Sequence, residues 1–431
     1  MTQCVLSLLT HGKIYTVSKL GQLMQFRFNR NTKLFLLSTL LYGFSFSVWE
    51  LFFNLYILSL GFNNDVLGLI RSANPLAALI LGLPLGLLSD RIGRRVSMII
   101  GLGICFIGMI FQVHLLNSFI IFLFGLVQGA GLMLYRVAQS PFIMSNSKPN
   151  NQAMIFSLNF GLVTIASMIG NLAAGQMPDV LQRWLGIVEG TAASYQWVIT
   201  AGILLAITSL IPIFLISKQD NPILKPGTFL SPKAMIRKIT ARPLARQLAL
   251  INLIMGFGAA ILIPYLNVFL RDKFNISNTL LGLLFSLSSL LVFVGSLMGP
   301  WLIRITRSRI IPTVATQSAS IIFLITLGFS PVLWFSAISM LLRTVLMQMS
   351  SPLLENFTML ITPSEDQAAI SSVRGVGWQA GQAVGIFISG LVQTRFGFSP
   401  LFITTSLCYI FAIVLTWIYF RPLEKSGAHD S

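Results

Sequence analysis

A carboxyl group lies deep in the first long apolar stretch of this 431-residue chain. Glu50 is 15 residues beyond the start of that stretch, which corresponds to about 22 Å along a helix. Ser47 and Asn54 stand three residues before it and four residues after it, so the three polar side chains share one helical face. An ionisable group so far inside apolar sequence is costly and is generally functional. Glu50 could carry a proton or pair with a cation.

A guanidinium group lies about halfway along a later apolar stretch, at Arg343, with Ser339 and Ser350 on the same side. Such a group could anchor an anionic part of a solute. Two structural alternatives stay open: Glu50 and Arg343 pair with each other, or each bonds to neighbouring helices. Other charged residues lie nearer the ends of their stretches, where they reach the surface or cap helices: Arg71, Arg136, Glu355 and Arg374.

Twelve apolar stretches, each of about 20 residues, hold these groups. Hydrophobic residues make up 55% of the chain and charged residues 10%, which is too little charge for a soluble surface. Lipid is therefore the solvent, and helices are required because lipid offers the backbone no hydrogen-bond partner. The predicted fold class is an all-α integral membrane protein with twelve transmembrane helices. The stretches are 35–60, 66–89, 95–115, 118–141, 152–176, 196–216, 247–270, 278–302, 310–329, 332–354, 368–392 and 399–420.

The net charge of +17 follows this topology. Lysines and arginines number 21 in the segments on the side of the N-terminus and 4 in the opposite loops, and four more lie inside helices. Such a bias orients the positive side toward the cytoplasm. We therefore expect cytoplasmic termini, a multi-pass protein of the plasma or inner membrane, and no nucleic-acid partner.

The chain also repeats itself. Gly43-Phe44 and Asn54 return as Gly256-Phe257 and Asn267, each 213 residues later. Other matches follow in the same order at offsets of 214 or 215: Gly68 with Gly282, Gly170 with Gly385, and Gly175 with Gly390. Ordered matches at a nearly constant offset indicate a duplicated six-helix unit, as in many transporters.

A ten-residue basic turn joins the second and third stretches, with the sequence Gly86-Leu-Leu-Ser-Asp90-Arg91-Ile-Gly93-Arg94-Arg95. The pattern resembles the signature loop between the second and third helices of the major facilitator superfamily of secondary transporters. The resemblance covers all twelve helices in layout and is specific in this loop. It implies two pseudo-symmetric six-helix bundles that rock about a central site, with the loop helping to close the cytoplasmic side.

In such a fold, Asp90 would face the N-terminal end of the eleventh helix near 367–370, where the helix dipole favours an anion. Arg91, Arg94 and Arg95 would hold the loop and anchor it to lipid phosphates. Two ridges of small residues would also meet where the second and eleventh helices pack. These ridges are Gly82 with Gly86, and Gly377 with Gly381 and Gly385.

The resemblance further implies a central cavity lined by the first, fourth, seventh and tenth helices. Polar or aromatic residues on these helices, and one on the eleventh, are the candidates to bind the solute and a proton. They are Ser47, Glu50, Asn54, Gln128, Tyr135, Arg136, Asn267, Arg343 and Trp378.

The predicted organisation has five segments. These are a cytoplasmic tail at 1–33, a six-helix bundle at 34–216, a cytoplasmic central loop at 217–246, a second bundle at 247–420 and a cytoplasmic tail at 421–431. In the central loop, Ser231-Pro232 is typical of the start of a short basic helix that lies on the inner leaflet.

These features predict a secondary active transporter that moves a small organic solute by alternating access, with a proton as the expected coupling ion. One alternative is a proton-coupled multidrug exporter, although the arginine that many exporters carry before Gln128-Gly129 is replaced by Gly125. The other is a transporter-like sensor without flux. We expect a monomer in contact with membrane lipid. No enzymatic activity, cofactor or metal is expected, because no paired carboxylates or metal-ligand spacing occur in the stretches.

Overall fold

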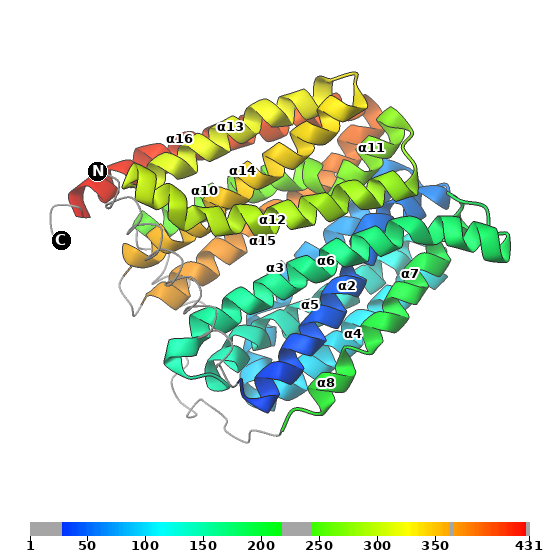
Figure 1. Ribbon diagram of the computed structural model, residues 1–431, viewed down its shortest axis with the longest axis horizontal. Coiled ribbons are helices and arrows are strands. Elements are labelled where there is room, and N and C mark those ends of the chain that lie inside the picture. The colour runs from blue at the N-terminus through cyan, green and yellow to red at the C-terminus, as the bar shows by residue number, and fades with distance from the viewer. Residues whose placement is uncertain (1–27, 218–242, 363–365, 428–431) are drawn as a thin grey trace, which may run out of the picture.

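The computed structural model describes residues 28–217, 243–362 and 366–427. In these ranges the chain forms long α-helices and one 3-10 turn, joined by short connections (Figure 1). The first half contains α2 (Arg30–Ser59), α3 (Asn64–Ile92), α4 (Arg94–His114), α5 (Ser118–Ser145), α6 (Pro149–Leu185), α7 (Ala192–Ile207) and α8 (Leu210–Phe214). The second half contains α10 (Pro243–Leu262), η1 (Ile263–Tyr265), α11 (Leu266–Phe274), α12 (Asn278–Thr306), α13 (Ile310–Phe329), α14 (Leu333–Leu360), α15 (Gln367–Phe396) and α16 (Ser399–Gly427).

The predicted all-α membrane fold with two six-helix halves is confirmed. Eleven segments of the described chain are long and apolar enough to cross a membrane, two of them formed by helices that continue one another across a break. The remaining segment is α15, whose 30 residues include Arg374, Gln379 and Gln382. This more polar helix packs against both α10 and α3.

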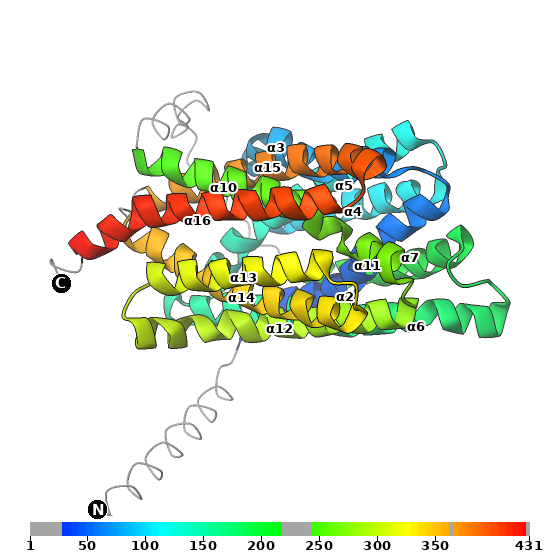
Figure 2. The same cartoon turned by 90° about the horizontal axis from the view of Figure 1, so that it is seen from above.

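Two seams join the halves. One packs α3 against α15 and the other packs α6 against α12, and the sequence repeat relates these two pairs of helices. In Figure 1 the halves meet near α11 and the connection between α6 and α7, and they diverge toward the other end. We call the end where the halves meet the sealed end; there α2 ends at Ser59 and α12 begins at Asn278. We call the opposite end, where the halves diverge, the terminal end. The helices of both halves run along one common axis (Figure 2).

The seventh span is broken at Pro264. This residue has no N–H to donate, and it lies in the 3-10 turn between α10 and α11. Side chains satisfy the carbonyl groups freed near the break: Ser389 Oγ donates to Ile261 O, and Asn54 Nδ2 donates to Pro264 O at 2.6 Å. The break therefore places a backbone hydrogen-bond acceptor, Pro264 O, at the boundary between the halves.

Two expectations need correction. The glycine ridges do not meet, because methyl groups added at Gly377 and Gly381 would contact Ala249 and Leu253 on α10, whereas one added at Gly82 would contact Met133 on α5. The last helix also runs beyond residue 420, since α16 extends to Gly427. The basic helix expected at Ser231-Pro232 lies outside the described residues.

Candidate functional site

The repeated asparagines Asn54 and Asn267 contact each other across the two halves. Asn54 Nδ2 donates to Asn267 Oδ1 at 3.0 Å, and both side chains are almost completely buried. Asn54 Nδ2 also donates to Pro264 O, and Asn267 Nδ2 donates to Leu51 O at 2.8 Å. Leu51 and Pro264 are themselves 213 residues apart. The two asparagines thus make the same backbone bond in each direction.

The repeated glycines form the closest contacts in the two seams. A methyl group added at Gly68 on α3 would lie 2.8 Å from Gly390 Cα on α15, and one added at Gly175 on α6 would lie 2.8 Å from Gly282 Cα on α12. A real Cβ atom does not fit at such distances, so glycine is required for the backbones to approach this closely.

A contact between an acidic residue and a threonine reinforces each seam beside its glycines. On the first seam the backbone N–H of Asp65 donates to Thr394 Oγ1 at 2.9 Å. On the second, Thr279 Oγ1 donates to Asp179 Oδ2 at 3.3 Å. In both seams the acid belongs to the first half and the threonine to the second, so repeat-related helices carry different residues here, and the two seams are related but not identical.

The second seam carries an additional network centred on Asn278. Glu189 Oε1 accepts from Asn278 Nδ2 at 2.8 Å, which joins the α6–α7 connection to the start of α12. Asn278 Oδ1 accepts from Tyr195 Oη of the first half and from Arg271 Nη1 of the second, both at 3.2 Å. Asn64, its counterpart on the first seam, has an enclosed Oδ1 without a partner. The sealed end is thus held more firmly on one side.

An ion pair lies one helical turn from these contacts, on the side of the terminal end. Arg71 Nη2 contacts Glu50 Oε2 at 2.6 Å, and Arg71 Nη1 donates to Glu50 Oε1 at 3.3 Å. Glu50 is four residues from Asn54, and Arg71 is three residues from Gly68. The Glu50 side chain is 43% exposed and that of Arg71 is 12% exposed. A two-pronged ion pair therefore stands immediately behind the contacts that close the sealed end.

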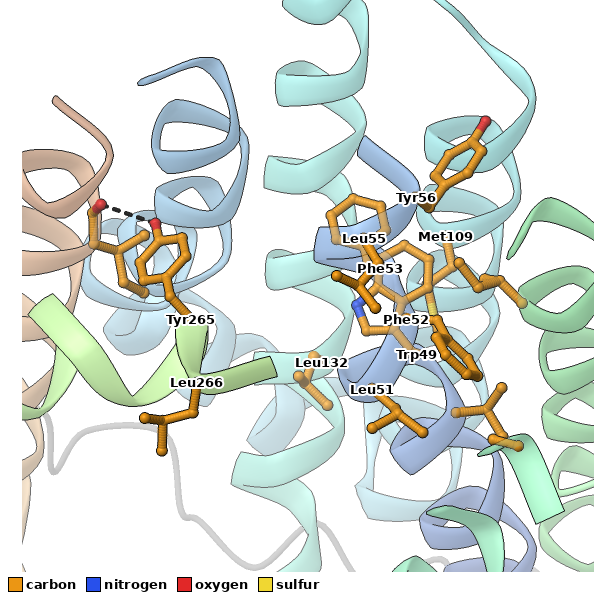
Figure 3. Close-up of a cluster of buried hydrophobic side chains, with 14 of the residues drawn as sticks. Trp49, Leu51, Phe52, Phe53, Leu55, Tyr56, Met109, Leu132, Tyr265 and Leu266 are labelled. Carbon is orange, nitrogen blue, oxygen red and sulfur yellow. Dashed lines mark hydrogen bonds between the residues drawn. The ribbon is translucent and has the colours of Figure 1, made fainter. Parts of the chain in front are cut away.

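Aromatic residues lie beside the Arg71 side of this pair. Trp49 and Phe53 stack with ring centroids 4.1 Å apart, and the Arg71 guanidinium lies 6.0 Å from the Phe53 ring. Figure 3 shows Trp49, Phe53 and their neighbours on α2, with Tyr265 approaching from the other half. Tyr265 is buried, and its hydroxyl donates to Ile386 O at 3.0 Å. The Arg71 guanidinium of the ion pair thus lies beside the stacked rings of Phe53 and Trp49.

The structure divides the polar stripe of α2 among three neighbours. Ser47 donates to Phe44 O at 2.7 Å and faces Gly170 on α6. Glu50 faces α3, and Asn54 faces the broken seventh span. The three side chains do share one side of the helix, but each has a separate partner.

The candidates on α5 also separate. Gln128 is buried and accepts at Oε1 from Gln112 Nε2 at 2.8 Å. Tyr135 is buried and packs against the Tyr42 ring at a centroid distance of 5.5 Å. Arg136, the next residue, is exposed. Gln128 and Tyr135 therefore belong to the interior of the first half, and Arg136 is the accessible member.

In the second half, Arg343 does not reach Glu50. Its side chain is 5% exposed and donates from Nη2 to Tyr409 Oη at 3.2 Å. Trp378 on α15 is 39% exposed, so its ring is accessible. The charged partner of Glu50 is Arg71, which the sequence placed too near a helix end to be singled out.

The ten-residue basic turn at 86–95 binds helix ends of its own half. Gly93 joins α3 to α4 with φ of +87°, a conformation that glycine adopts without strain. Arg94 Nη1 donates to Pro141 O at 3.0 Å, and Arg95 Nη2 donates to Phe214 O at 2.6 Å. Both arginines thus hold the ends of neighbouring helices through backbone carbonyls.

The remaining loop residues lie free of the second half. Asp90 forms no hydrogen bond or ion pair with the residues that the structure describes, and Arg91 is exposed. A methyl group added at Gly86 would meet nothing within 4 Å. The loop is therefore not packed against α15 in this conformation.

The family model described as Major Facilitator Superfamily matches residues 35–245 and 248–431. Solved structures with the same fold include the nucleoside transporter NupG, at 15% identity and a TM-score of 0.68, covering 91% of this chain and 98% of that one. The D-xylose-proton symporter is 14% identical, with a TM-score of 0.67 over 90% and 97% of the two chains. The fucose:proton symporter FucP of E. coli is 16% identical, with a TM-score of 0.61 over 90% and 98%. No curated protein is significantly similar to the chain in sequence.

Proposed function

Since the chain belongs to the major facilitator superfamily, we propose that it is a secondary active transporter of a small organic solute. The two halves would rock about their seams, so that the site between them opens to one side of the membrane at a time. The conformation described above corresponds to the state that is closed at the sealed end.

The observation that carries this proposal is the position of the Glu50–Arg71 pair. Glu50 lies nine residues before the end of α2 and Arg71 seven residues after the start of α3, with the Glu50 side chain 43% exposed, directly behind the contacts that close the sealed end. An accessible ion pair at this depth is expensive to keep and marks a functional site in membrane proteins. Solute hydroxyl or amide groups could bond to the same two-pronged pair.

The chemistry of the pair supports a proton as the coupling ion. Protonation of Glu50 removes its negative charge and weakens its ion pair with Arg71. Uptake of a proton therefore changes the charge and the hydrogen-bonding groups that the site presents to the solute. Two similar structures are described as proton symporters of the sugars fucose and D-xylose, which supports a proton as the coupling ion here.

The orientation follows from the charge bias. We propose that the terminal end faces the cytoplasm, because 21 lysines and arginines lie in the segments on that side. The described conformation would then be open inward. We also propose a monomer in the plasma or inner membrane.

Flux in proteoliposomes tests the proposal. The purified protein is reconstituted, a pH gradient is applied, and uptake of labelled solutes is followed together with proton movement. Glu50→Gln is expected to uncouple or abolish flux, and Arg71→Gln to weaken it at least tenfold. Arg183→Gln is the matched control, because Arg183 is exposed at the far end of α6.

Three outcomes would contradict parts of the proposal. Solute binding without flux in the wild type identifies a sensor. Export of unrelated hydrophobic compounds identifies a multidrug carrier. Normal proton-driven flux in Glu50→Gln shows that the coupling site lies elsewhere.

A further inference from the structure

Arg343 is a buried cation without an anionic partner. It lies in the interior of α14 with 5% of its surface exposed, and it forms no ion pair with any carboxylate of the described residues. Tyr409 provides its contacts: the hydroxyl accepts from Nη2 at 3.2 Å, and the guanidinium carbon lies 5.9 Å from the ring centroid. Its enclosed Nε has no partner. Of the five N–H donors that a guanidinium offers, one is used.

Such an arrangement is costly in a membrane protein. A guanidinium keeps its charge in essentially all protein environments, and an uncompensated buried charge destabilises a fold strongly. A tyrosine hydroxyl and ring supply partial compensation. The second half therefore holds a positive charge that no carboxylate of the described residues neutralises.

The sequence repeat shows that this position does not need a charge for folding. The residue 215 positions earlier is Gln128, in the corresponding place on α5. Gln128 is likewise buried; its Oε1 accepts from the neutral amide of Gln112 at 2.8 Å, and its Nε2 has no partner among the described residues. The first half thus fills this place with a pair of amides, whereas the second half keeps an arginine. The difference points to a role for the charge.

We propose that Arg343 binds a monovalent anion within the second half, which is either the carboxylate of the transported solute or an inorganic anion such as chloride. A planar guanidinium can give a carboxylate two parallel hydrogen bonds, and a chloride ion can accept from the same donors. If the anion is the solute's own carboxylate, this inference rests on the proposed transport function and assigns it organic anions.

Thermal stability of the purified protein tests anion binding without any flux measurement. Sodium chloride and sodium lactate are titrated separately against a constant background of a bulky sulfonate salt. Either probe is expected to raise the unfolding midpoint of the wild type by about 2 °C or more at saturation, because an anion that binds the folded state stabilises it. Arg343→Gln should lose the shift, Arg343→Lys should keep part of it, and Arg183→Gln should keep it in full.

The pattern of shifts separates the sources. A shift with chloride alone assigns an inorganic ion, and a shift with lactate that chloride competes away assigns the solute's carboxylate. Labelled lactate uptake would then fall at least tenfold in Arg343→Gln. The proposal is overturned if neither probe shifts the wild type, or if Arg343→Gln shifts as the wild type does. Flux that needs Glu50 but is indifferent to Arg343 would exclude the solute's carboxylate as the bound anion and leave the proposed function standing.

Discussion

Asn54 and Asn267 occupy the same place in the two halves and bond to each other where the halves meet, at 3.0 Å. Each also donates to the carbonyl three residues before the other, at Pro264 and Leu51. The contact is therefore nearly symmetric about an axis that relates the two halves. Because both bonds cross from one half to the other, opening of the sealed end must break them together.

Loss of this contact should favour the conformation that is open at the sealed end. Asn54→Ala removes two hydrogen bonds of about 1 kcal/mol each, which corresponds to a shift of tenfold or more in the equilibrium between conformations. Distances between spin labels at the exposed residues Asn63 and Ser399 report the change. Asn267→Ala should act in the same direction.

A double-mutant cycle makes this prediction specific. The double variant should change the free-energy difference between the two conformations by less than the sum of the changes in the two single variants, because the single variants remove shared bonds. Asn252→Ala is the control, since Asn252 Nδ2 bonds to Leu248 O within its own helix. Strict additivity of the two variants would argue against a shared contact.

The glycine contacts predict a steric block. Gly68→Ala and Gly282→Ala each place a methyl group against backbone atoms of the opposite half, so the sealed end cannot close fully and transport should fall at least tenfold. Gly103→Ala is the matched control, because nothing lies within 4 Å of its added methyl group. The control should be neutral or slightly stabilising, since alanine favours a helix by up to about 1 kcal/mol over glycine. Equal transport by all three variants would refute the block.

The Asn278 network predicts an asymmetric seal. Asn278→Ala removes bonds to Glu189, Tyr195 and Arg271, whereas Asn64→Ala removes a side chain whose Oδ1 has no partner. Reactivity of single cysteines in the two seams should therefore rise much more for Asn278→Ala, by about tenfold for each 1.4 kcal/mol lost. Similar effects of the two substitutions would show that both seams are held equally.

A substitution in the basic turn at 86–95 should affect the conformation that is closed at the terminal end and not the described one. Asp90→Asn should leave the unfolding midpoint of the described state nearly unchanged, because Asp90 bonds to nothing among the described residues. It should nevertheless slow transport at least tenfold, since closure at the terminal end would bring the carboxylate to the N-terminal end of α15. Wild-type transport rates with normal membrane expression would remove Asp90 from the mechanism.

Much of the fold could be predicted from the sequence because lipid restricts the chain to helices of known length. The repeat also coincides with residues that contact each other across the seams. Gly68, Gly282, Gly175 and Gly390 are repeated residues, and they are also the residues that touch across the seams. The repeat established which residues are equivalent, but contact depends on how the halves dock, and a sequence pattern does not contain that geometry.

The site was harder to predict for a similar reason. Helical spacing put Ser47, Glu50 and Asn54 on one side of α2, but that side is wide enough to meet three different elements. The partner of Glu50 depends on the register between α2 and α3, which brings Arg71 within 2.6 Å. Pro264 was a visible signal of a broken span, since a proline within a helix removes a donor. The contact between its carbonyl and Asn54 depends on how the two halves dock.

The break at Pro264 also bears on the direction of transport. Ser389 bonds to Ile261 O from within the second half, so that bond persists when the halves separate. Pro264 O depends on Asn54 of the first half, and it becomes a vacant acceptor beside Glu50 when the sealed end opens. Pro264 O and the amide groups of Asn54 and Asn267 would then be free to bond to the solute from one compartment only. Affinity for the solute would differ between the two faces of the membrane, which would favour loading on one side and release on the other.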